Sequence, residues 1–558
     1  MGTEKVVVLV LSGGGNPEIN NYSQYLQANR LGTHLSGLPD AEATVMFGSG
    51  LRPESSPDLP PDVLRENGDG ETRFIRGEIP NNQPATLAQV SQYFFGPLAA
   101  RQWNESDHFV LIAADHGMPN DWDLTDRQVT NEQKVENSFK NNCINLWTPE
   151  SLLYPEKSCL SVDQLRHMIE QNIPPEIPKT FVMSQCYSGG FHLLGYSKDA
   201  DGKPHRNTGN ICGFTAITSD TTSAGCTPFV EESRYDGYER RMAEQLTGLS
   251  IITGVKFDNP VRQLSLAHDE ALLKDNTKDV PLRTSEAYVL DYYSFVTKKK
   301  PEKKEEAEST DEFSLQDFLD AFWKEFNKTK NDMKRRWGEG LDNVLSEDMT
   351  RRLGLVVRLQ AQIETWFSGY KGQLVGASLE SVMTKRRAIV FQKDLLKEQL
   401  QKLKESLDKK LKPVEAQLWI FLGQQKDADS LELMEFERIS ELSPEVISAR
   451  LSKEDPTLQK LERYKAYDDR READILYWAR RQPKLFKSEE IRDLIQLSAN
   501  IHALDTEKGN LDVLEGQLRR LETQMIVAGM IDWMAKNHQG FALEDVKNLV
   551  MCESNARL

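Results

Sequence analysis

Short, continuous apolar runs that alternate with helical segments constrain the fold of residues 1–297 more than any other feature. Residues 6–11 are all valine or leucine and lead into turn residues, which is typical of a strand buried on both faces of a parallel sheet. Similar runs predict strands at 43–47, 107–113, 179–184 and 211–218. Strands that alternate with helices are the signature of an α/β fold with a mostly parallel sheet.

The segments between these runs have helical spacing. In residues 86–101, for example, Leu87, Val90, Tyr93 and Phe94 recur at three- and four-residue intervals and so share one face. Helices are likewise predicted at 20–35, 162–171, 235–246 and 283–296. Residues 48–78 are rich in Pro, Gly, Ser and acidic side chains and are expected to be mostly loop. We therefore predict one α/β domain over residues 1–297.

A charged segment at 298–311 separates this domain from a region of different character. Residues 298–310 read K-K-K-P-E-K-K-E-E-A-E-S-T, and a segment without large apolar side chains cannot bury enough surface to order itself. We interpret it as a linker. Beyond it the strand signals vanish and long charged segments with helical periodicity follow, which predicts an all-helical domain over residues 312–558.

A leucine stripe within residues 382–411, with Pro413 just behind it, is the clearest helical pattern of this second region. It consists of Leu395, Leu396, Leu400, Leu403 and Leu407. The stripe predicts a hairpin arm or a short coiled coil, and packing within the domain is favoured over docking of a partner. Further helices are predicted after Ser443 and Asp455, each with proline at the first helical position, and at 488–504 and 511–536.

Composition excludes several classes of protein. The formal net charge of −17 argues against general nucleic-acid binding, because phosphate recognition requires a basic surface. No apolar run approaches the length of a membrane span or of a signal-peptide core, so we expect no membrane association and a cytoplasmic location. Six cysteines in 558 residues, none in a C-x-x-C pair, are expected to be reduced thiols rather than a disulfide scaffold or a zinc ribbon.

Two predicted strands end on residues that carry chemistry. Residues 180–191 read T-F-V-M-S-Q-C-Y-S-G-G-F and deliver Cys186 to a turn of small residues, whereas 107–117 read D-H-F-V-L-I-A-A-D-H-G and end on His116 and Gly117. Active groups gather at the carboxyl ends of parallel strands, and an imidazole activates a thiol by taking its proton. A lone cysteine is more often an inert core residue. The two strand ends together nevertheless favour a cysteine nucleophile and its base.

These two stretches resemble the two motifs of the legumain-like peptidases, which are caspase-like cysteine peptidases. Residues 12–22, S-G-G-G-N-P-E-I-N-N-Y, are similar to that family's glycine turn followed by Asn-Tyr. Residues 213–226, G-F-T-A-I-T-S-D-T-T-S-A-G-C, resemble the strand and loop that line its primary specificity pocket. The resemblance covers nearly all of the first domain and none of the helical region.

The resemblance implies a caspase-like sheet flanked by helices, peptide-bond hydrolysis through an acyl-enzyme, no cofactor or metal, and often a zymogen. By motif, Cys186 is the nucleophile, His116 transfers the proton, Gly117 donates its N–H to the oxyanion, and Asn21 orients the histidine. The N–H of Cys186 is a candidate second donor to the oxyanion.

The specificity pocket departs from the family pattern. An arginine normally follows Asn-Tyr, but here Ser23 follows Tyr22, so a preference for asparagine is not expected. Basic-specific relatives place an acid two residues before the nucleophile, where this chain has Ser184. The remaining pocket candidates are Ser219, Asp220, Thr222 and Ser223. Asp220 is the charged one, and it either favours a basic substrate side chain or only caps a local turn.

The chain is thus predicted to be a caspase-like cysteine endopeptidase that acts on protein or peptide substrates. The helical region is expected to be regulatory or to recognise a substrate, and activation is expected through cleavage by another protease within 298–310 or 120–158, because exposed disordered segments are where proteases cut. The alternative is a non-catalytic pseudopeptidase whose helical region binds partner proteins.

Overall fold

The computed structural model describes residues 4–16, 19–50, 63–66, 72–119, 141–148, 158–225, 227–228, 230, 235–298, 341–368, 379–424, 475–476, 479 and 484–558. Most of the expected linker, the proline-capped helices expected after Ser443 and Asp455, and much of the expected 120–158 cleavage region lie outside these residues.

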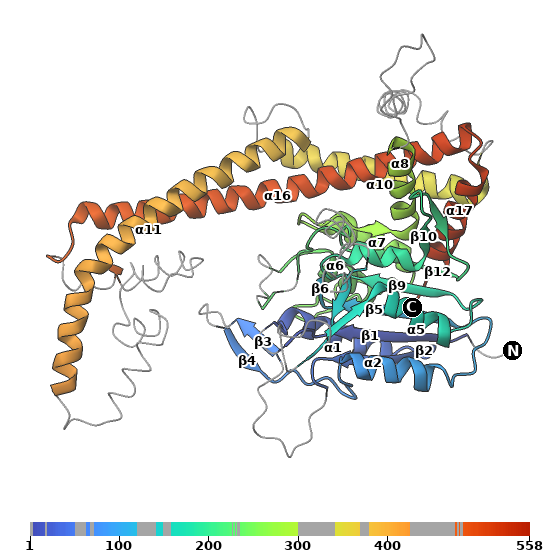
Figure 1. Ribbon diagram of the computed structural model, residues 1–558, viewed down its shortest axis with the longest axis horizontal. Helices are drawn as coiled ribbons and strands as arrows, with labels where there is room; N and C mark the ends of the chain where they lie inside the picture. The colour runs from blue at the N-terminus through green and yellow to red at the C-terminus, as the bar shows by residue number, and fades with distance from the viewer. Residues whose placement is uncertain are drawn as a thin grey trace, which may run out of the picture. The chain divides into compact units, whose positions relative to one another are not determined.

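A six-stranded, mostly parallel sheet forms the centre of the N-terminal region (Figure 1). Its strands are β1 (Val6–Ser12), β2 (Ala41–Phe47), β5 (His108–Ala114), β9 (Lys179–Met183), β12 (Ile211–Thr215) and β13 (Leu282–Arg283). Their order is β13-β12-β9-β5-β1-β2, and β13 alone runs antiparallel to its neighbour within this sheet. The predicted α/β class is confirmed, and five of the six strands lie close to the expected apolar runs, whereas the short β13 was not predicted.

Helices cover both faces of the sheet because each strand has two apolar faces. Val6, Val8 and Val10 of β1 pack with α1 (Tyr22–Ser36), α6 (Tyr238–Thr247) and α7 (Leu264–Lys274). The alternate residues, Val7, Leu9 and Leu11, pack on the other side with α2 (Leu87–Tyr93), the π-helical turn η1 (Phe94–Leu98) and α5 (Val162–Asn172). Side chains along a strand point alternately to opposite faces, so a single apolar run supplies both cores.

Several short elements were not predicted, since they carry no long periodic pattern. These are a small antiparallel sheet of β6 (His116–Met118), β7 (Cys143–Asn145) and β8 (Cys159–Ser161), the pair β3 (Val63–Glu66) and β4 (Thr72–Ile75), the hairpin β10 (Tyr196–Lys198) and β11 (Pro204–Arg206), and the 3-10 helix η3 (Ser188–Leu194). Helix α7 was also missed. β3 and β4 lie inside the stretch expected to be mostly loop.

The C-terminal region is helical where the structure describes it, but it does not separate from the sheet at the expected linker. After α8 (Thr284–Lys298) come α10 (Asn343–Ser368), α11 (Leu379–Gln424), α16 (Ser488–Lys536) and α17 (Gly540–Asn555). The chain divides instead into one compact unit of residues 1–65, 72–369 and 516–558, and a second of 66–71 and 370–515. The domain boundaries 1–297 and 312–558 therefore differ from the observed division.

Buried polar contacts tie the last helices into the first unit. Arg352 of α10 is fully buried, and its guanidinium contacts Glu286 of α8 as well as Asp348, at 2.6 Å. Glu553 of α17 accepts hydrogen bonds from the backbone N–H and the hydroxyl of Ser285, at 2.7 and 2.8 Å. Buried charges require such partners, so these helices belong to the sheet unit physically although their sequences look like those of the second unit.

Two disulfides correct the expectation that the cysteines are reduced. Cys143 pairs with Cys159 across the neighbouring strands β7 and β8, with Cα atoms 5.1 Å apart. Cys212 of β12 pairs with Cys552 of α17, with Cα atoms 6.0 Å apart. The first pair depends on two short strands that the sequence does not reveal, and the second joins residues 340 positions apart, so neither follows from cysteine spacing.

The second unit contains a helical hairpin. Ion pairs link Arg386 with Asp512, Lys393 with Asp505, and Lys410 with Glu490, the last at 2.6 Å, so the early part of α16 runs antiparallel to α11. Leu400 and Leu407 of the stripe are buried between the helices, while Leu395 is 46% exposed. The expected arm is confirmed, but α11 continues through Pro413, and α16 is one helix where two were expected.

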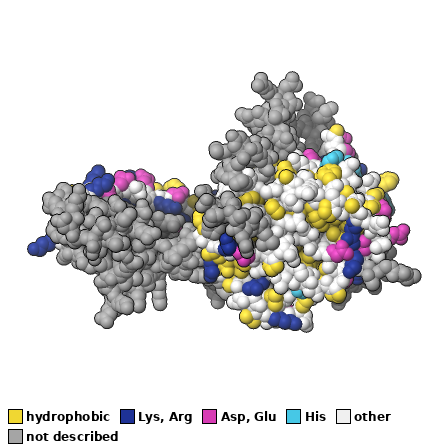
Figure 2. All heavy atoms as spheres, turned by 90° about the horizontal axis from the view of Figure 1, so that it is seen from below, with side chains coloured by type: hydrophobic (Ala, Val, Ile, Leu, Met, Phe, Trp, Pro, Cys, Tyr) yellow, Lys and Arg dark blue, Asp and Glu magenta, His cyan; other side chains and the backbone are white. Residues whose placement is uncertain are grey.

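The outer surface shows charges of both signs. On the face in Figure 2, the described Lys and Arg side chains stand singly or beside Asp and Glu, without a continuous basic area. Among the helices that the structure describes, none is long and apolar enough to cross a membrane.

Candidate active site

His116 stands immediately beyond the carboxyl end of β5, at the start of β6. The preceding residue, Asp115, is fully buried, and its carboxylate accepts hydrogen bonds from the backbone N–H groups of His116, at 2.6 Å, and of Gly14. Burial raises the pKa of Asp115 well above its ordinary value. A Cβ on Gly14 would overlap this carboxylate, so the glycine turn after β1 closes directly onto the histidine segment.

The His116 ring is held by the residues that begin α1. Its Nε2 lies 2.6 Å from the carbonyl oxygen of Ile19 and 3.4 Å from the side-chain nitrogen of Asn21, the N-cap of that helix. A carbonyl only accepts, so Nε2 carries the proton and Nδ1 is left as the acceptor of the neutral ring. Burial lowers the pKa of His116, opposed by the bond to Ile19. With the proton on Nε2, the Asn21 amide nitrogen finds no acceptor there, and its orienting role stays a prediction.

Cys186 follows the carboxyl end of the adjacent strand β9. Strands β5 and β9 pair in parallel with Ala113 opposite Met183, so both ends reach the same edge of the sheet. The hydroxyl of Ser184 donates to the carbonyl oxygen of Ala113 at 2.9 Å and fastens one strand end to the other. Ser184 thus supports the backbone rather than presenting its hydroxyl to a substrate.

Gly117 brings the two motifs into contact. A Cβ on Gly117 would overlap the carbonyl oxygen of Cys186, so the backbones of the histidine and cysteine segments touch at this point. A glycine is required here for close approach. Tyr187, the residue after the thiol, has a left-handed backbone with φ of +59°, which an L-residue seldom adopts outside functional or tightly constrained turns.

The thiol itself lies against Ser223, in the loop that follows β12. The Cys186 sulfur is 3.8 Å from the Ser223 carbonyl oxygen and 3.9 Å from its hydroxyl, which donates at 3.0 Å to the carbonyl oxygen of Ser184. Burial raises the pKa of Cys186; the Ser223 hydroxyl opposes this, and the carboxylates of Asp279 and Glu239 add to it. The resting thiol is therefore protonated near neutral pH.

The other predicted pocket residues make polar contacts in the same loop. Asp220 is exposed and accepts a hydrogen bond from the Thr218 hydroxyl at 2.7 Å, which is the contact of a turn cap. The hydroxyl of Thr222, also exposed, accepts from Lys278 at 3.3 Å. The carbonyl oxygen of Ser219 accepts from the side chain of Asn142 at 2.8 Å. Of the pocket candidates, Ser223 contacts the Cys186 sulfur and Ser184 lies two residues before Cys186.

Three further residues shape the site, and the sequence did not single them out. The amide of Asn142 donates to the carbonyl oxygens of Tyr187, at 2.7 Å, and of Ser219, so it joins the turn after Cys186 to the loop after β12. Asp279 and Glu239 are buried carboxylates whose charges act on the thiol. Only a three-dimensional arrangement brings these separate segments together, and no local motif marks them.

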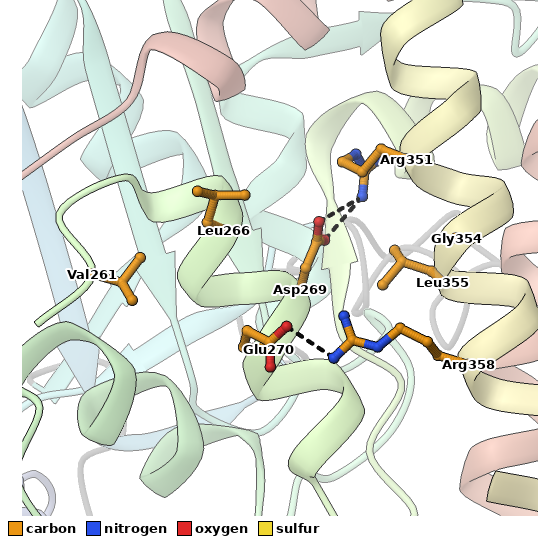
Figure 3. Close-up of a pocket in the computed structure, with 8 residues that line it drawn as sticks. All are labelled: Val261, Leu266, Asp269, Glu270, Arg351, Gly354, Leu355 and Arg358. Atoms are coloured by element: carbon orange, nitrogen blue, oxygen red, sulfur yellow. Dashed lines mark hydrogen bonds and ion pairs between the residues drawn. The ribbon is translucent and has the colours of Figure 1, made fainter. Parts of the chain in front are cut away.

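A cavity of about 390 Å³ lies elsewhere, between α7 and α10 (Figure 3). Its acidic residues Asp269 and Glu270 point to Arg351 and Arg358 and pair with them, with closest distances of 2.9 Å. Since its lining charges neutralise one another, we interpret the cavity as a junction between two helices.

No three or more His, Cys, Asp and Glu side chains within the described ranges group in a way that would hold a metal ion. Comparison with protein-family models finds no match, and no curated protein has a significantly similar sequence.

Proposed function

We propose that the chain is a caspase-like cysteine endopeptidase with Cys186 as nucleophile and His116 as its base. The observation that carries this proposal is the contact between Gly117 and the Cys186 carbonyl at the ends of two adjacent parallel strands. The segments that carry Cys186 and His116 meet at the sheet edge where active groups of α/β proteins gather, which supports the proposal. The resemblance of both motifs to legumain-like peptidases supports the same function.

In the proposed reaction the Cys186 sulfur attacks the carbonyl carbon of the scissile peptide bond while Nδ1 of His116 takes the thiol proton. Backbone N–H groups of Gly117 and Cys186 stabilise the oxyanion. The C–N bond then breaks, the amine leaves with the proton from His116, and a thioester remains. Water, deprotonated by His116, attacks the thioester and regenerates the thiol while the acid product leaves.

Burial favours a neutral pair at rest, because it raises the pKa of Cys186 and lowers that of His116. A neutral imidazole is competent to accept a proton, whereas an imidazolium is not. The protonated thiol therefore depends on general-base transfer at the moment of attack, which supports a role for His116 beyond packing.

A preference for Arg or Lys before the scissile bond is part of the proposal. Asp220 is the exposed acid of the pocket loop, whereas Asp279 and Glu239 are fully buried. An exposed carboxylate near the cleavage point would attract a basic side chain through charge-assisted hydrogen bonds. Asp220→Ala separates the loop acid from the buried ones: loss of basic preference assigns specificity to Asp220, and unchanged preference removes it from the pocket.

The disulfides bear on compartment and activation. Disulfides persist mainly in oxidising compartments, so they favour such a location over the cytoplasm expected from the sequence. Activation by cleavage in the 298–310 or 120–158 segments remains our proposal, with the helical region regulatory. The bond from Cys212 to Cys552 means that such a cut alone would not release the C-terminal helices.

The decisive experiment is hydrolysis of a fluorogenic peptide library varied at the residue before the scissile bond, using wild type before and after limited proteolysis. Cys186→Ala and His116→Gln should each abolish cleavage, and a thiol-reactive peptide probe should label wild type but not Cys186→Ala. His108→Gln is a matched control, since His108 is a buried histidine at the opposite end of β5, bonded to Thr180 at 2.8 Å. Absence of labelling and cleavage in every state would favour the pseudopeptidase scaffold.

A further inference from the structure

The loop that contacts the thiol has little packing of its own. Asp220, Thr221 and Thr222 are exposed, yet Ser223 in the same loop lies against the Cys186 sulfur. Exposed loops are mobile unless other groups hold them. The position of Ser223 is therefore set by contacts from outside the loop. Its own hydroxyl bonds the Ser184 carbonyl oxygen and the Tyr187 N–H bonds the Thr221 carbonyl oxygen, while further contacts come from Asn142 on one side and from the segment after α7 on the other.

Asp279 is the principal anchor on that second side. Its carboxylate accepts a hydrogen bond at 2.7 Å from the backbone N–H of Ala224, the residue next to Ser223, and another from the backbone of Tyr238. Asp279 is fully buried, so it is held in place rather than sampling solvent. Its neighbour Lys278 reaches the hydroxyl of Thr222 at 3.3 Å and adds a second link to the same loop.

Helix α16 in turn holds the segment that carries Asp279. Residues 275–281 have no helix or strand, but the guanidinium of Arg520, fully buried, donates to the carbonyl oxygens of Asp279, at 2.7 Å, Asp275, at 2.6 Å, and Thr277, at 2.8 Å. It also pairs with the Asp275 carboxylate at 2.9 Å. A Cβ on Gly516 would overlap the Thr277 carbonyl, so the helix backbone lies directly on the segment.

We propose that Asp279, held by Arg520, is a positioning residue that fixes Ala224 and Ser223 against the Cys186 nucleophile. This inference rests on the proposed peptidase function and names a role for the C-terminal helix within it. The chain of contacts runs from α16 through the 275–279 segment to Ala224 and then to the sulfur. Only an arginine supplies enough N–H donors in one planar group to bind several carbonyl oxygens of one segment.

It follows that the C-terminal part of α16, residues 516–536, completes the active site. If this part of the helix only inhibited the enzyme, its removal would leave a working site. Loss of Arg520 would instead release the 275–279 segment, which orients Ser223. The active form therefore retains residues 516–558, and any activating cut must leave them attached.

A matched pair of substitutions at Asp279 tests the positioning role. Asn is isosteric with Asp and still accepts from the Ala224 N–H, whereas Ala does not. We expect Asp279→Asn to keep a kcat close to wild type and Asp279→Ala to lower kcat by about 100-fold, the order reached when reacting groups are misplaced by an ångström. An equal loss in both variants would assign the carboxylate charge itself to function and overturn the proposal, as would an unchanged kcat in Asp279→Ala.

Arg520→Gln tests the anchor, with Arg352→Gln as the control for loss of a buried arginine. Arg352 bonds Glu286, Asp348 and Gln524 and none of the 275–279 segment. Among molecules that remain folded by circular dichroism, Arg520→Gln should lower kcat at nearly constant KM, and Arg352→Gln should not. Equal kcat values for the two variants would contradict the proposal.

A readout independent of catalysis separates this inference from the peptidase proposal. The rate of iodoacetamide alkylation at Cys186, mapped by mass spectrometry with Cys186→Ala as blank, reports on the surroundings of the thiol whether or not the chain cleaves peptides. We expect a changed rate in Asp279→Ala and Arg520→Gln, and the wild-type rate in Asp279→Asn and Arg352→Gln. Unchanged alkylation in the first two variants would defeat the positioning role, even if wild type proves to be an active peptidase.

Discussion

Helix α16 contributes to both compact units, and its two parts differ in how they are held. Residues 488–515 pair with α11 through partly exposed ion pairs such as Lys393–Asp505, around a narrow leucine core. Residues 516–536 carry the fully buried Arg520 and pack in the sheet unit. The comparison teaches that helical periodicity identifies a helix, whereas the burial of its charged groups decides which domain it belongs to.

The largest difference in unfolding free energy should appear between two substitutions, one of a buried arginine in the sheet unit and one of a partly exposed lysine in the hairpin. Arg352→Ala leaves Glu286 buried without its cation, which costs about 3–5 kcal/mol of unfolding free energy. Urea unfolding followed by circular dichroism measures the loss. Lys393→Ala is the comparison variant, and a loss as large as that of Arg352→Ala would show that the two parts are held alike.

The disulfide from Cys212 to Cys552 should contribute the next largest effect, because it closes a loop of 340 residues. We expect the double variant Cys212→Ser and Cys552→Ser to lose about 2–5 kcal/mol in the sheet unit. Thermal melting with and without reductant checks this. Without reductant the double variant should melt below wild type, and because reductant also opens Cys143–Cys159, reduced wild type should melt with the reduced double variant. The same melting temperature for wild type and the double variant without reductant would mean that the Cys212–Cys552 bond does not contribute to stability.

The pH dependence of stability should distinguish the buried acids from the hairpin ion pairs. Burial raises the pKa of Glu553 to about 7 from its ordinary 4.5. The folded form therefore binds the proton of Glu553 more tightly than the unfolded form does. The contribution of Glu553 to the free energy of unfolding is fully present below pH 4.5 and is lost as the pH rises through 7. The loss is about 3 kcal/mol, because each tenfold difference in proton affinity between the folded and unfolded forms is worth about 1.4 kcal/mol.

In Glu553→Gln the free energy of unfolding should change less with pH between 4.5 and 7 than in wild type, because Gln does not titrate. Urea unfolding at several pH values measures this dependence. Other buried acids with raised pKa values, such as Asp279, add slopes of the same sign and remain in the variant. The same pH dependence of unfolding free energy in wild type and Glu553→Gln would show that Glu553 does not contribute to it.

The smallest effect should come from the hairpin. Removing both partners of the Lys393–Asp505 pair by alanine substitution should cost no more than about 1 kcal/mol, since pairs near the surface are screened by water and salt. The difference from wild type should shrink at a salt concentration of about 1 M. A larger, salt-independent loss would place this pair with the buried network of the first unit.

Much of the sheet was predictable because burial on both faces demands continuous apolar runs, and the runs that end at His116 and Cys186 are among the clearest. Strands β5 and β9, which carry these two runs, are adjacent and parallel. Ser223 contacts the thiol and Asp220 has the contact of a turn cap, and the specificity pocket stays a prediction for both.

The other contacts of the site and the domain membership of the C-terminal helices could not be predicted from the sequence, for physical reasons. Asn142, Asp279 and Arg520 reach the site through bonds to backbone atoms of distant segments, and backbone partners leave no pattern in the side-chain sequence. Pro413 was expected to follow the end of a helix because it lacks one N–H, but the turns on either side keep their own hydrogen bonds and α11 continues. Domain membership of the C-terminal helices depends on buried pairs such as Glu553 with Ser285, which have no local signal.

The covalent bond between Cys212 and Cys552 has a consequence for how processing would be seen. A single cut between these two positions gives two polypeptides that remain one particle, so a nicked molecule migrates at its full mass on a non-reducing gel and as two bands once thiol is added. Maturation by a cut in 298–310 would therefore be missed if it were followed by mass under non-reducing conditions, and reductant would be needed to separate the fragments.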